Sequence, residues 1–331
     1  MILVTGGAGY IGSHTCVALS EADIGYAVLD NFCNSDPCVL ERIQSITGKP
    51  FPFFKGDVRD EFLLRRIFAK QEISGVIHFA GLKAVGESVE RPLDYFDTNV
   101  AGSLCVLRAM NRAGCKRLVF SSSATVYGDA STMPLTEDMP CAATNPYGRT
   151  KLMVEEILAD LEQSDPSWRI ARLRYFNPAG AHESGLIGEN PRGVPSNLMP
   201  FVTQVAAGLR PTLTVFGGDY PTPDGTGVRD FIHVMDLAQG HVAALKRLEQ
   251  PSTGLVINLG TGKGTSVLEM IRAFEKASGL DVPYKIAGRR PGDVAICFAD
   301  VHHAHQALGW RAERNIDDMC RDMWRWQLSK H

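Results

Sequence analysis

Tyr147 and Lys151 are the residues whose types and spacing most directly suggest chemistry. They stand four positions apart in the stretch 145–151, Asn-Pro-Tyr-Gly-Arg-Thr-Lys, at the predicted head of a helix. Side chains at this spacing share one helix face, so the phenol and the ammonium lie side by side. A free phenol has a pKa near ~10, and a neighbouring ammonium lowers it by favouring the phenolate. The pair suits proton transfer, although one tyrosine and one lysine are not a specific motif.

A glycine-rich turn near the N-terminus supplies a partner for this pair. The apolar run 2–4 is typical of a buried parallel strand, and Gly6, Gly9 and Gly12 follow it at a spacing of three, ahead of a helical pattern. Such glycines let the backbone turn tightly and approach a pyrophosphate at the helix N-terminus. The next apolar run ends at Asp30, which is placed to hold the adenine-ribose hydroxyls and to repel a 2′-phosphate. The motif therefore predicts binding of NAD rather than NADP.

Apolar runs and helical patterns alternate through the first half of the chain. This order predicts an α/β fold, a Rossmann-type doubly wound parallel sheet whose active-site residues gather at the carboxyl ends of the strands. The further expected strands are 51–54, 75–79, 117–120 and 170–174, and the expected helices include 61–69, 98–113 and 147–161. Asp57, the segment 79–83 and the serines 121–123 each follow a predicted strand. We expect them to meet Tyr147 and Lys151 at one edge of the sheet.

The amino-acid composition of the chain changes after about residue 178. Glycine and proline become more frequent, as in the segment 219–227. We expect an NAD-binding domain over 1–178 and a second, smaller α/β substrate-binding lobe over 179–331. The boundary is approximate, since the chain can cross between lobes. The lobe is expected to pack on the sheet and close a cleft at its edge.

Composition excludes several classes of partner and cofactor. The 331 residues have a formal net charge of −3 and a hydrophobic fraction of 44%, so nucleic acid and membrane surfaces are not expected partners. We expect no signal peptide, because a predicted strand begins at residue 2. We expect no membrane span, because no apolar run is long enough. Eight scattered cysteines indicate a reducing cytoplasm without disulfides. His302, His303 and His305 favour a polar loop or helix start over a metal site.

Longer runs carry a specific resemblance that extends essentially from end to end. They are the segments 5–15, 78–88, 121–128, 174–181, 197–200 and 224–236. In them the chain resembles the extended short-chain dehydrogenase/reductase family, and within it the enzymes that epimerise UDP-hexoses at C4. The resemblance implies tightly bound NAD, reversible conversion of UDP-galactose and UDP-glucose through a 4-keto sugar, and a homodimer. Helices 93–113 and 146–161 are the candidates for the dimer contact.

The same resemblance assigns roles to individual residues. Tyr147 would take the proton of the C4 hydroxyl, Lys151 would bind the nicotinamide ribose and lower the tyrosine pKa, and Ser123 would hydrogen-bond the reacting oxygen. Lowering that pKa from ~10 to ~7 requires about 4 kcal/mol, which two nearby positive charges can supply. The implied NAD contacts are Gly6, Gly9, Tyr10, Ile11, Gly12, Asp30, Asn31, Asn34, Ser35, Asp57, Val58, Phe79, Ala80, Gly81, Lys83, Asn99, Ser121, Tyr147, Lys151, Tyr175 and Phe176.

A second set of residues is implied for the UDP-sugar. Arginine forks suit a pyrophosphate, Asp293 can accept from a ribose, and Phe216 would line the uracil pocket. The implied contacts are Lys83, Ser123, Tyr147, Asn177, Asn197, Leu198, Phe216, Arg229, Arg290, Asp293 and Cys297. Cys297 departs from family members that act only on the unmodified hexose, which carry a tyrosine there. The smaller side chain predicts that UDP-GlcNAc and UDP-GalNAc are also accepted, unless a neighbouring side chain fills the space.

Related chemistries are distinguished by the residues after Ser123. Sugar-nucleotide 4,6-dehydratases carry Asp and Glu directly after their serine or threonine, whereas this chain has Ala124 and Thr125, so no carboxylate is available for elimination. A dehydratase-like or net NAD-dependent oxidoreductase remains the alternative, and the latter would release NADH. A non-catalytic NAD sensor is a third interpretation. The retention of Ser123, Tyr147 and Lys151 together argues against it.

Overall fold

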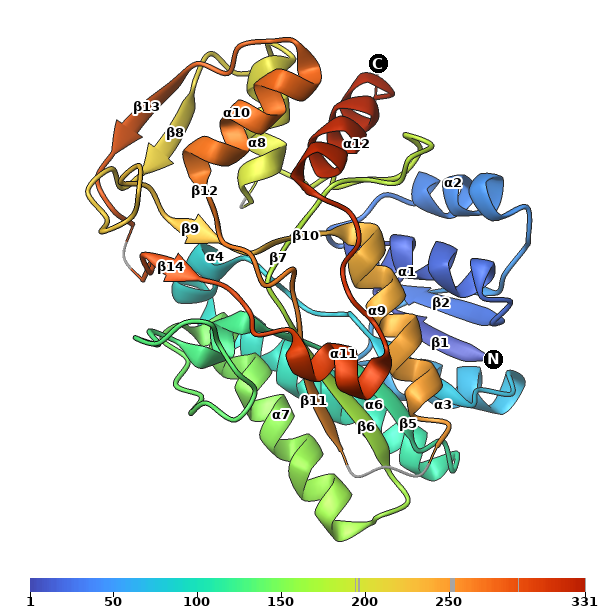
Figure 1. The fold of residues 1–331 in the computed structure, drawn as a ribbon. Helices are drawn as coiled ribbons and strands as arrows, with labels where there is room; N and C mark the ends of the chain where they lie inside the picture. Colours follow the sequence, from blue (N-terminus) through green and yellow to red (C-terminus); the bar gives the residue numbers. More distant parts are fainter. Residues whose placement is uncertain (194, 196, 251–253, 291, 331) are drawn as a thin grey trace.

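The fold is organised by a seven-stranded parallel sheet in the order β11-β6-β5-β4-β1-β2-β3. We describe a computed structural model that covers residues 1–193, 195, 197–250, 254–290 and 292–330 (Figure 1). The predicted doubly wound α/β class is confirmed. The strands are β1 (Ile2–Thr5), β2 (Tyr26–Asp30), β3 (Phe53–Lys55), β4 (Gly75–His78), β5 (Arg117–Ser123), β6 (Arg169–Tyr175) and β11 (Leu255–Leu259).

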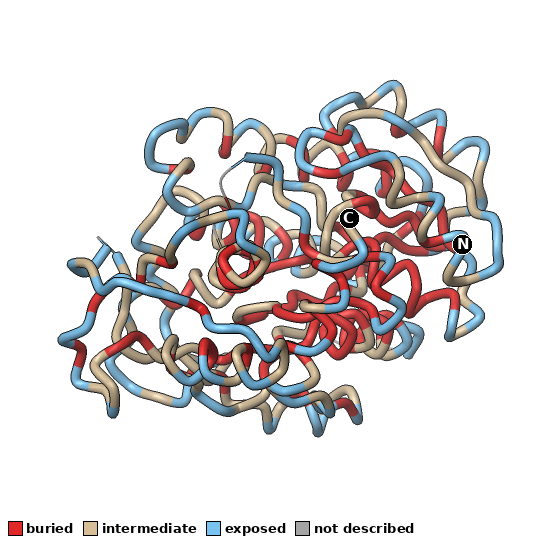
Figure 2. Tube along the Cα trace, turned by 90° about the horizontal axis from the view of Figure 1, so that it is seen from above, coloured by how far each residue is buried: buried red, intermediate tan, exposed pale blue. Residues whose placement is uncertain are grey.

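Both faces of this sheet are covered by helices. Within β1, Val4 points into one hydrophobic cluster and Leu3 into the other, because successive side chains of a strand face opposite ways. One cluster is covered by α1 (Tyr10–Glu21), α2 (Cys38–Thr47), α9 (Val234–Arg247) and α11 (His302–Leu308), and the other by α3 (Glu61–Lys70), α6 (Gly102–Arg112) and α7 (Pro146–Ser164). Figure 2 shows the buried residues concentrated along these central elements. The apolar run 2–4 within β1 is therefore explained by burial on both faces of the sheet.

The second half of the chain builds a smaller lobe and also returns to the large sheet. The lobe holds a core that includes Met270, Phe274 and Trp326. Its elements are β7 (Asn177–Ala179), α8 (Leu198–Ala206), β8 (Leu213–Phe216), β9 (Val228–Arg229), β10 (Phe231–His233), β12 (Thr265–Ser266), α10 (Val267–Ser278), β13 (Tyr284–Ala287), β14 (Ile296–Cys297) and α12 (Ile316–Leu328). By contrast, β11, α9 and α11 belong to the sheet and its cover. The boundary at residue 178 stays a prediction, since the chain crosses between the two parts.

Several elements differ in detail from the sequence expectation. β5 extends three residues beyond 120, because Ser121, Ser122 and Ser123 continue the parallel pairing with β6. The expected helix 98–113 is preceded by α4 (Val85–Glu90) and α5 (Pro92–Tyr95), and it starts as a π-helical segment, η1 (Phe96–Ala101), before α6. The three clustered histidines lie in α11, which begins at His302.

Two general properties concern the chain as a whole. Among the described residues, no helix combines the length and apolar character that a membrane crossing requires. All eight cysteines lie within the described ranges and are free.

A buried ion pair fastens α7 to β6 beneath the serines. The Nε of Arg174 donates to Oε1 of Glu155 at 3.0 Å, and Nη2 donates to Oε2 at 2.6 Å. Ser122 donates a further hydrogen bond to the same carboxylate. Both charged side chains are buried, so each depends on the other for compensation. The pair fixes the helix that carries Tyr147 and Lys151 against the strand ends.

Replacing Glu155 with Gln should destabilise the fold. The change leaves the Arg174 guanidinium buried without its counter-charge, and we expect the free energy of unfolding to fall by about 3 kcal/mol. Urea denaturation measures this loss. Glu156→Gln, on the exposed face of the same helix, is the matched control and should change stability by less than about 0.5 kcal/mol. Equal effects of the two substitutions would contradict a stabilising role for the buried pair.

Candidate active site

A cavity of about 1550 Å³ runs between the carboxyl edge of the sheet and the smaller lobe. Every residue that the sequence predicted for the cofactor or substrate lines it, except Asn99 and Leu198. Asn99 is buried behind the cavity wall. Its side-chain amide forms hydrogen bonds with the backbone N–H and C=O of Leu82 and with the hydroxyl of Thr150. Leu198 is the first residue of α8 and packs against the core of the smaller lobe. Both therefore lie behind residues that line the cavity.

The glycine turn at one end of the cavity has the geometry that its spacing predicts. Gly6 has a φ of +70°, and a Cβ there would lie 2.8 Å from the backbone nitrogen of Ala80. A Cβ on Gly12 would lie 2.3 Å from the Gly6 carbonyl oxygen. Gly9 is the N-cap of α1 and has no side-chain cap, so the first amides of α1 stay open to an anionic ligand. The turn thus fits a dinucleotide pyrophosphate.

Asp30 ties the glycine turn to the loop that follows β2. Its Oδ2 accepts from the backbone of Ala8 at 3.0 Å, while its Oδ1 accepts from the backbone of Phe32 at 2.8 Å and from the hydroxyl of Ser35 at 3.0 Å. The carboxylate is buried at the end of its strand. It therefore shapes the wall where a dinucleotide's adenosine would lie, as well as presenting negative charge there.

Tyr147 and Lys151 both line this cavity. Asn145 caps α7 by accepting from the backbone of Gly148 at 2.8 Å, which starts the helix immediately before Tyr147. Lys151 is buried one turn later, with its Nζ 5.9 Å from the Tyr147 ring centroid and donating to the Ser121 carbonyl at 2.7 Å. Ser123, at the end of β5, accepts from Thr125. Serine, tyrosine and lysine thus line one part of the cavity.

Burial is the main influence on the pKa values of Tyr147 and Lys151. Burial raises the pKa of Tyr147, and only the nearby Ser123 hydroxyl acts in the other direction. Burial also lowers the pKa of Lys151 to about 8, which weakens the charge expected to stabilise the phenolate. The expected lowering of the Tyr147 pKa, which counts on two nearby positive charges, stays a prediction.

The second lobe brings the predicted UDP-site residues together. Arg290 donates from Nε to Asp293 at 2.9 Å, and its guanidinium stacks 4.9 Å from the Phe216 ring centroid. Arg229 lies 4.0 Å from the other oxygen of Asp293. Cys297 is paired with Arg229 in neighbouring strands β14 and β9. This cluster offers two guanidinium forks and an aromatic face to an anionic, heterocyclic ligand.

Glu189 is a cavity residue that sequence reasoning missed. Its carboxylate is buried and accepts from Lys83 at 2.8 Å and from Asn197 at 2.6 Å. No motif marks it, because its partners stand 106 positions before it and 8 positions after it. The nearest signal was its place in a glycine- and proline-rich segment just ahead of the matching run that begins at Asn197.

Comparison with known proteins assigns the chain to a family. The family model described as GDP-mannose 4,6 dehydratase matches residues 3–323. A UDP-glucose 4-epimerase from Bacillus subtilis is 58% identical over 328 residues, which cover 99% of this chain and 97% of that protein. The chain belongs to the UDP-glucose 4-epimerase family.

Solved members of the UDP-glucose 4-epimerase family share the whole fold. The structure from Stenotrophomonas maltophila, with bound NAD and formylated UDP-arabinopyranose, is 54% identical with a TM-score of 0.98, and the match covers 99% of this chain and 98% of that one. The structure from Bifidobacterium longum, in complex with NAD+ and UDP, is 53% identical with a TM-score of 0.96 and the same coverage. Structural similarity therefore extends over both the sheet and the smaller lobe.

The buried lysine should leave a signature in stability against pH. Its folded pKa of about 8 lies below its usual 10.5, so the unfolded chain binds more protons between these values. The penalty of charging Lys151 is complete below pH 8 and is relieved as pH rises toward 10.5. We expect nucleotide-free wild type to gain stability relative to Lys151→Met between pH 7.5 and 9.5. Urea unfolding of both proteins across this pH range tests the expectation. A difference in unfolding free energy that stays constant with pH would contradict a lowered pKa for Lys151.

Proposed function

We propose that this protein interconverts UDP-galactose and UDP-glucose by epimerisation at C4, with tightly bound NAD, and that it acts on UDP-GalNAc and UDP-GlcNAc as well. The single observation that carries the proposal is the arrangement of one continuous cavity. Ser123, Tyr147 and Lys151 line it together with the glycine turn and with the cluster of Arg229, Arg290 and Asp293. A dinucleotide and a nucleotide sugar fit such a cavity from two directions, with their reactive ends near the tyrosine.

The protein's own residues manage the proton and the orientation of the sugar. Bound NAD supplies the acceptor, and then the donor, of the C4 hydride. Tyr147 takes the proton of the C4 hydroxyl and returns it to the same oxygen, while Ser123 hydrogen-bonds that oxygen. Lys151 binds the nicotinamide ribose and contributes positive charge. The cofactor's positive charge adds to that of Lys151, and together they oppose the effect of burial on the tyrosine.

The chemistry stops at reversible oxidation because no acid or base follows Ser123. The next residues form a 3-10 turn, η2 (Ala124–Tyr127), in which Thr125 donates twice to the Ser123 hydroxyl. Elimination of water would need a carboxylate there. A chain without one has no committed second step, so the 4-keto sugar is reduced again. Ala124 and Thr125 therefore favour an epimerase over the dehydratase named by the matching family model.

We infer a homodimer in which α5, η1, α6 and α7 form the contact. Leu93 and Met153 are exposed apolar residues of α5 and α7. We also infer a cytoplasmic location, which suits eight free cysteines.

Replacing Tyr147 with Phe should remove the base and leave the binding cavity intact. We expect the turnover of UDP-galactose without added NAD to fall by at least about 100-fold, because a positioned acid–base group contributes on that order. Product analysis by chromatography measures it. Tyr284→Phe, at an exposed position of β13, is the control and should keep wild-type turnover. Wild-type activity in Tyr147→Phe would reject the catalytic assignment, and accumulation of free NADH by wild type would favour the oxidoreductase.

Replacing Cys297 with Tyr should narrow the substrate range. The ring would occupy space that we assign to the substituent on C2 of the sugar, and steric discrimination of this kind is worth about 1–3 kcal/mol. We expect activity on UDP-GalNAc to fall by about 10- to 100-fold, while activity on UDP-galactose serves as the internal control. Paired assays on both sugars decide the question. Equal loss on both substrates, or none on either, would rule out Cys297 as the determinant.

A further inference from the structure

A single buried carboxylate oxygen bridges the two halves of the cavity. Oε1 of Glu189 accepts from Nζ of Lys83, which follows β4 of the large sheet. It also accepts from Nδ2 of Asn197, the N-cap residue of α8 in the smaller lobe. All three residues line the cavity, and the Glu189 side chain is only 3% exposed. Because one atom holds both donors, a shift of either partner is transmitted to the other.

The carboxylate also decides how Asn197 presents its amide. An ionised carboxylate only accepts hydrogen bonds, so the NH₂ group of Asn197 must face Glu189. The amide oxygen of Asn197 is then left as an acceptor for other partners. The second oxygen of Glu189 is buried and has no hydrogen-bond partner among the described residues. The negative charge of Glu189 is balanced by the part-exposed Lys83, and removing the lysine leaves the buried carboxylate uncompensated.

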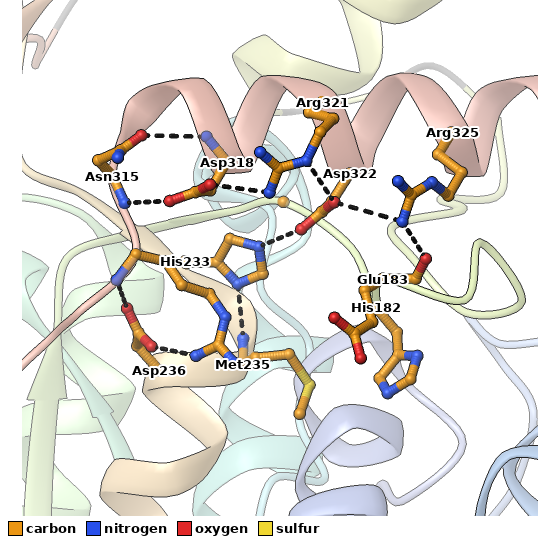
Figure 3. A network of polar contacts seen from close by, with 12 residues as sticks. His182, Glu183, His233, Met235, Asp236, Asn315, Asp318, Arg321, Asp322 and Arg325 are labelled. Atoms are coloured by element: carbon orange, nitrogen blue, oxygen red, sulfur yellow. Dashed lines mark hydrogen bonds and ion pairs between the residues drawn. The ribbon is translucent and has the colours of Figure 1, made fainter.

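The position of Glu189 is set by α12, which holds the segment 182–189 along its length. Trp326 donates from Nε1 to the Glu189 carbonyl at 3.2 Å, and a Cβ on Gly188 would lie 2.5 Å from the same indole. Arg325 donates to the carbonyl of Glu183, as Figure 3 shows. The segment therefore has little freedom to move away from α12.

The helix α12 is in turn fixed by a buried histidine. Nδ1 of His233 accepts from the backbone of Met235 at 3.1 Å, so Nε2 carries the proton and donates to Asp322 at 3.2 Å (Figure 3). Both side chains are buried. His233 is the N-cap of α9, which packs against α1 behind the glycine turn. A continuous set of contacts thus leads from the large sheet through α12 to Glu189.

We propose that Glu189 is a positioning residue that couples the cofactor half of the cavity to the substrate half. It acts through Lys83 on one side and Asn197 on the other. Its proximity to the cofactor half is also visible at Tyr10, in the first turn of α1, where the Glu189 charge adds to burial in raising the tyrosine pKa. The coupling predicts that a change on one side alters ligand binding on the other. The identity of the two ligands rests on the proposed function.

Glu189→Gln tests the proposal with a side chain of the same shape. The substitution removes the charge that holds Lys83 and allows the Asn197 amide to turn over. We expect calorimetric titration of UDP into NAD-loaded protein to show binding weakened by about tenfold, with KM for UDP-galactose raised similarly and kcat changed by less than about threefold. Glu183→Gln, exposed on the same segment and held only through its backbone carbonyl, is the matched control and should bind as wild type does.

Asn197→Asp tests the coupling from the opposite side. An aspartate would repel Glu189 and break the bridge at its substrate end, and we expect the fraction of NAD that copurifies to fall by several-fold. The cofactor is quantified after it is released from denatured protein, so this readout needs no activity. Wild-type UDP binding in Glu189→Gln, or wild-type NAD content in Asn197→Asp, would overturn the proposal. Failure of wild type to epimerise would reject the proposed function alone, because both binding measurements stand without turnover.

Discussion

The close approach of two backbone segments at the edge of the sheet is the constraint on which the rest of the site depends. β1 and β4 are neighbours, so the turns that follow them meet at Gly6 and Ala80 with no room for a Cβ. This contact sets where α1 begins, and with it the direction of its uncapped amides. The segment that carries Lys83 leaves from the same point. The glycine turn and this part of the cavity wall are therefore in direct backbone contact.

Electrostatics in this molecule is governed by burial as much as by pairing. Tyr147 and Lys151 are both buried, and desolvation disfavours the charged form of each. Beneath the site, the buried side chains of Glu155 and Arg174 compensate each other at short range.

Local patterns predicted the sheet, the glycine turn and the residues at strand ends, because these follow from residues that are close in sequence, whereas most other cavity residues were implied by the family resemblance. The apolar run of β1, the glycines and the residues just beyond strand ends all lie where parallel-strand topology requires them. Patterns failed where a property depends on distant partners. Ser121 to Ser123 are polar, yet they continue β5 because β6 lies beside them. Glu189 carries no local signal, since Lys83 is 106 positions away. The pKa of Tyr147 depends on burial, and the spacing of four residues between Tyr147 and Lys151 does not predict burial.

The return of β11 to the large sheet affects how the chain is made. Strand β6 has β5 on one side, and its other edge stays unpaired until residues 255–259 have been synthesised. An open edge presents unpaired backbone groups to other chains, although charged side chains such as the three arginines of β6 oppose such pairing. The edge of β6 therefore stays open while about eighty further residues are translated. Typical synthesis rates are ~5–20 residues per second. The large sheet is therefore complete only after residues from both halves of the chain are available, even though each half has its own core.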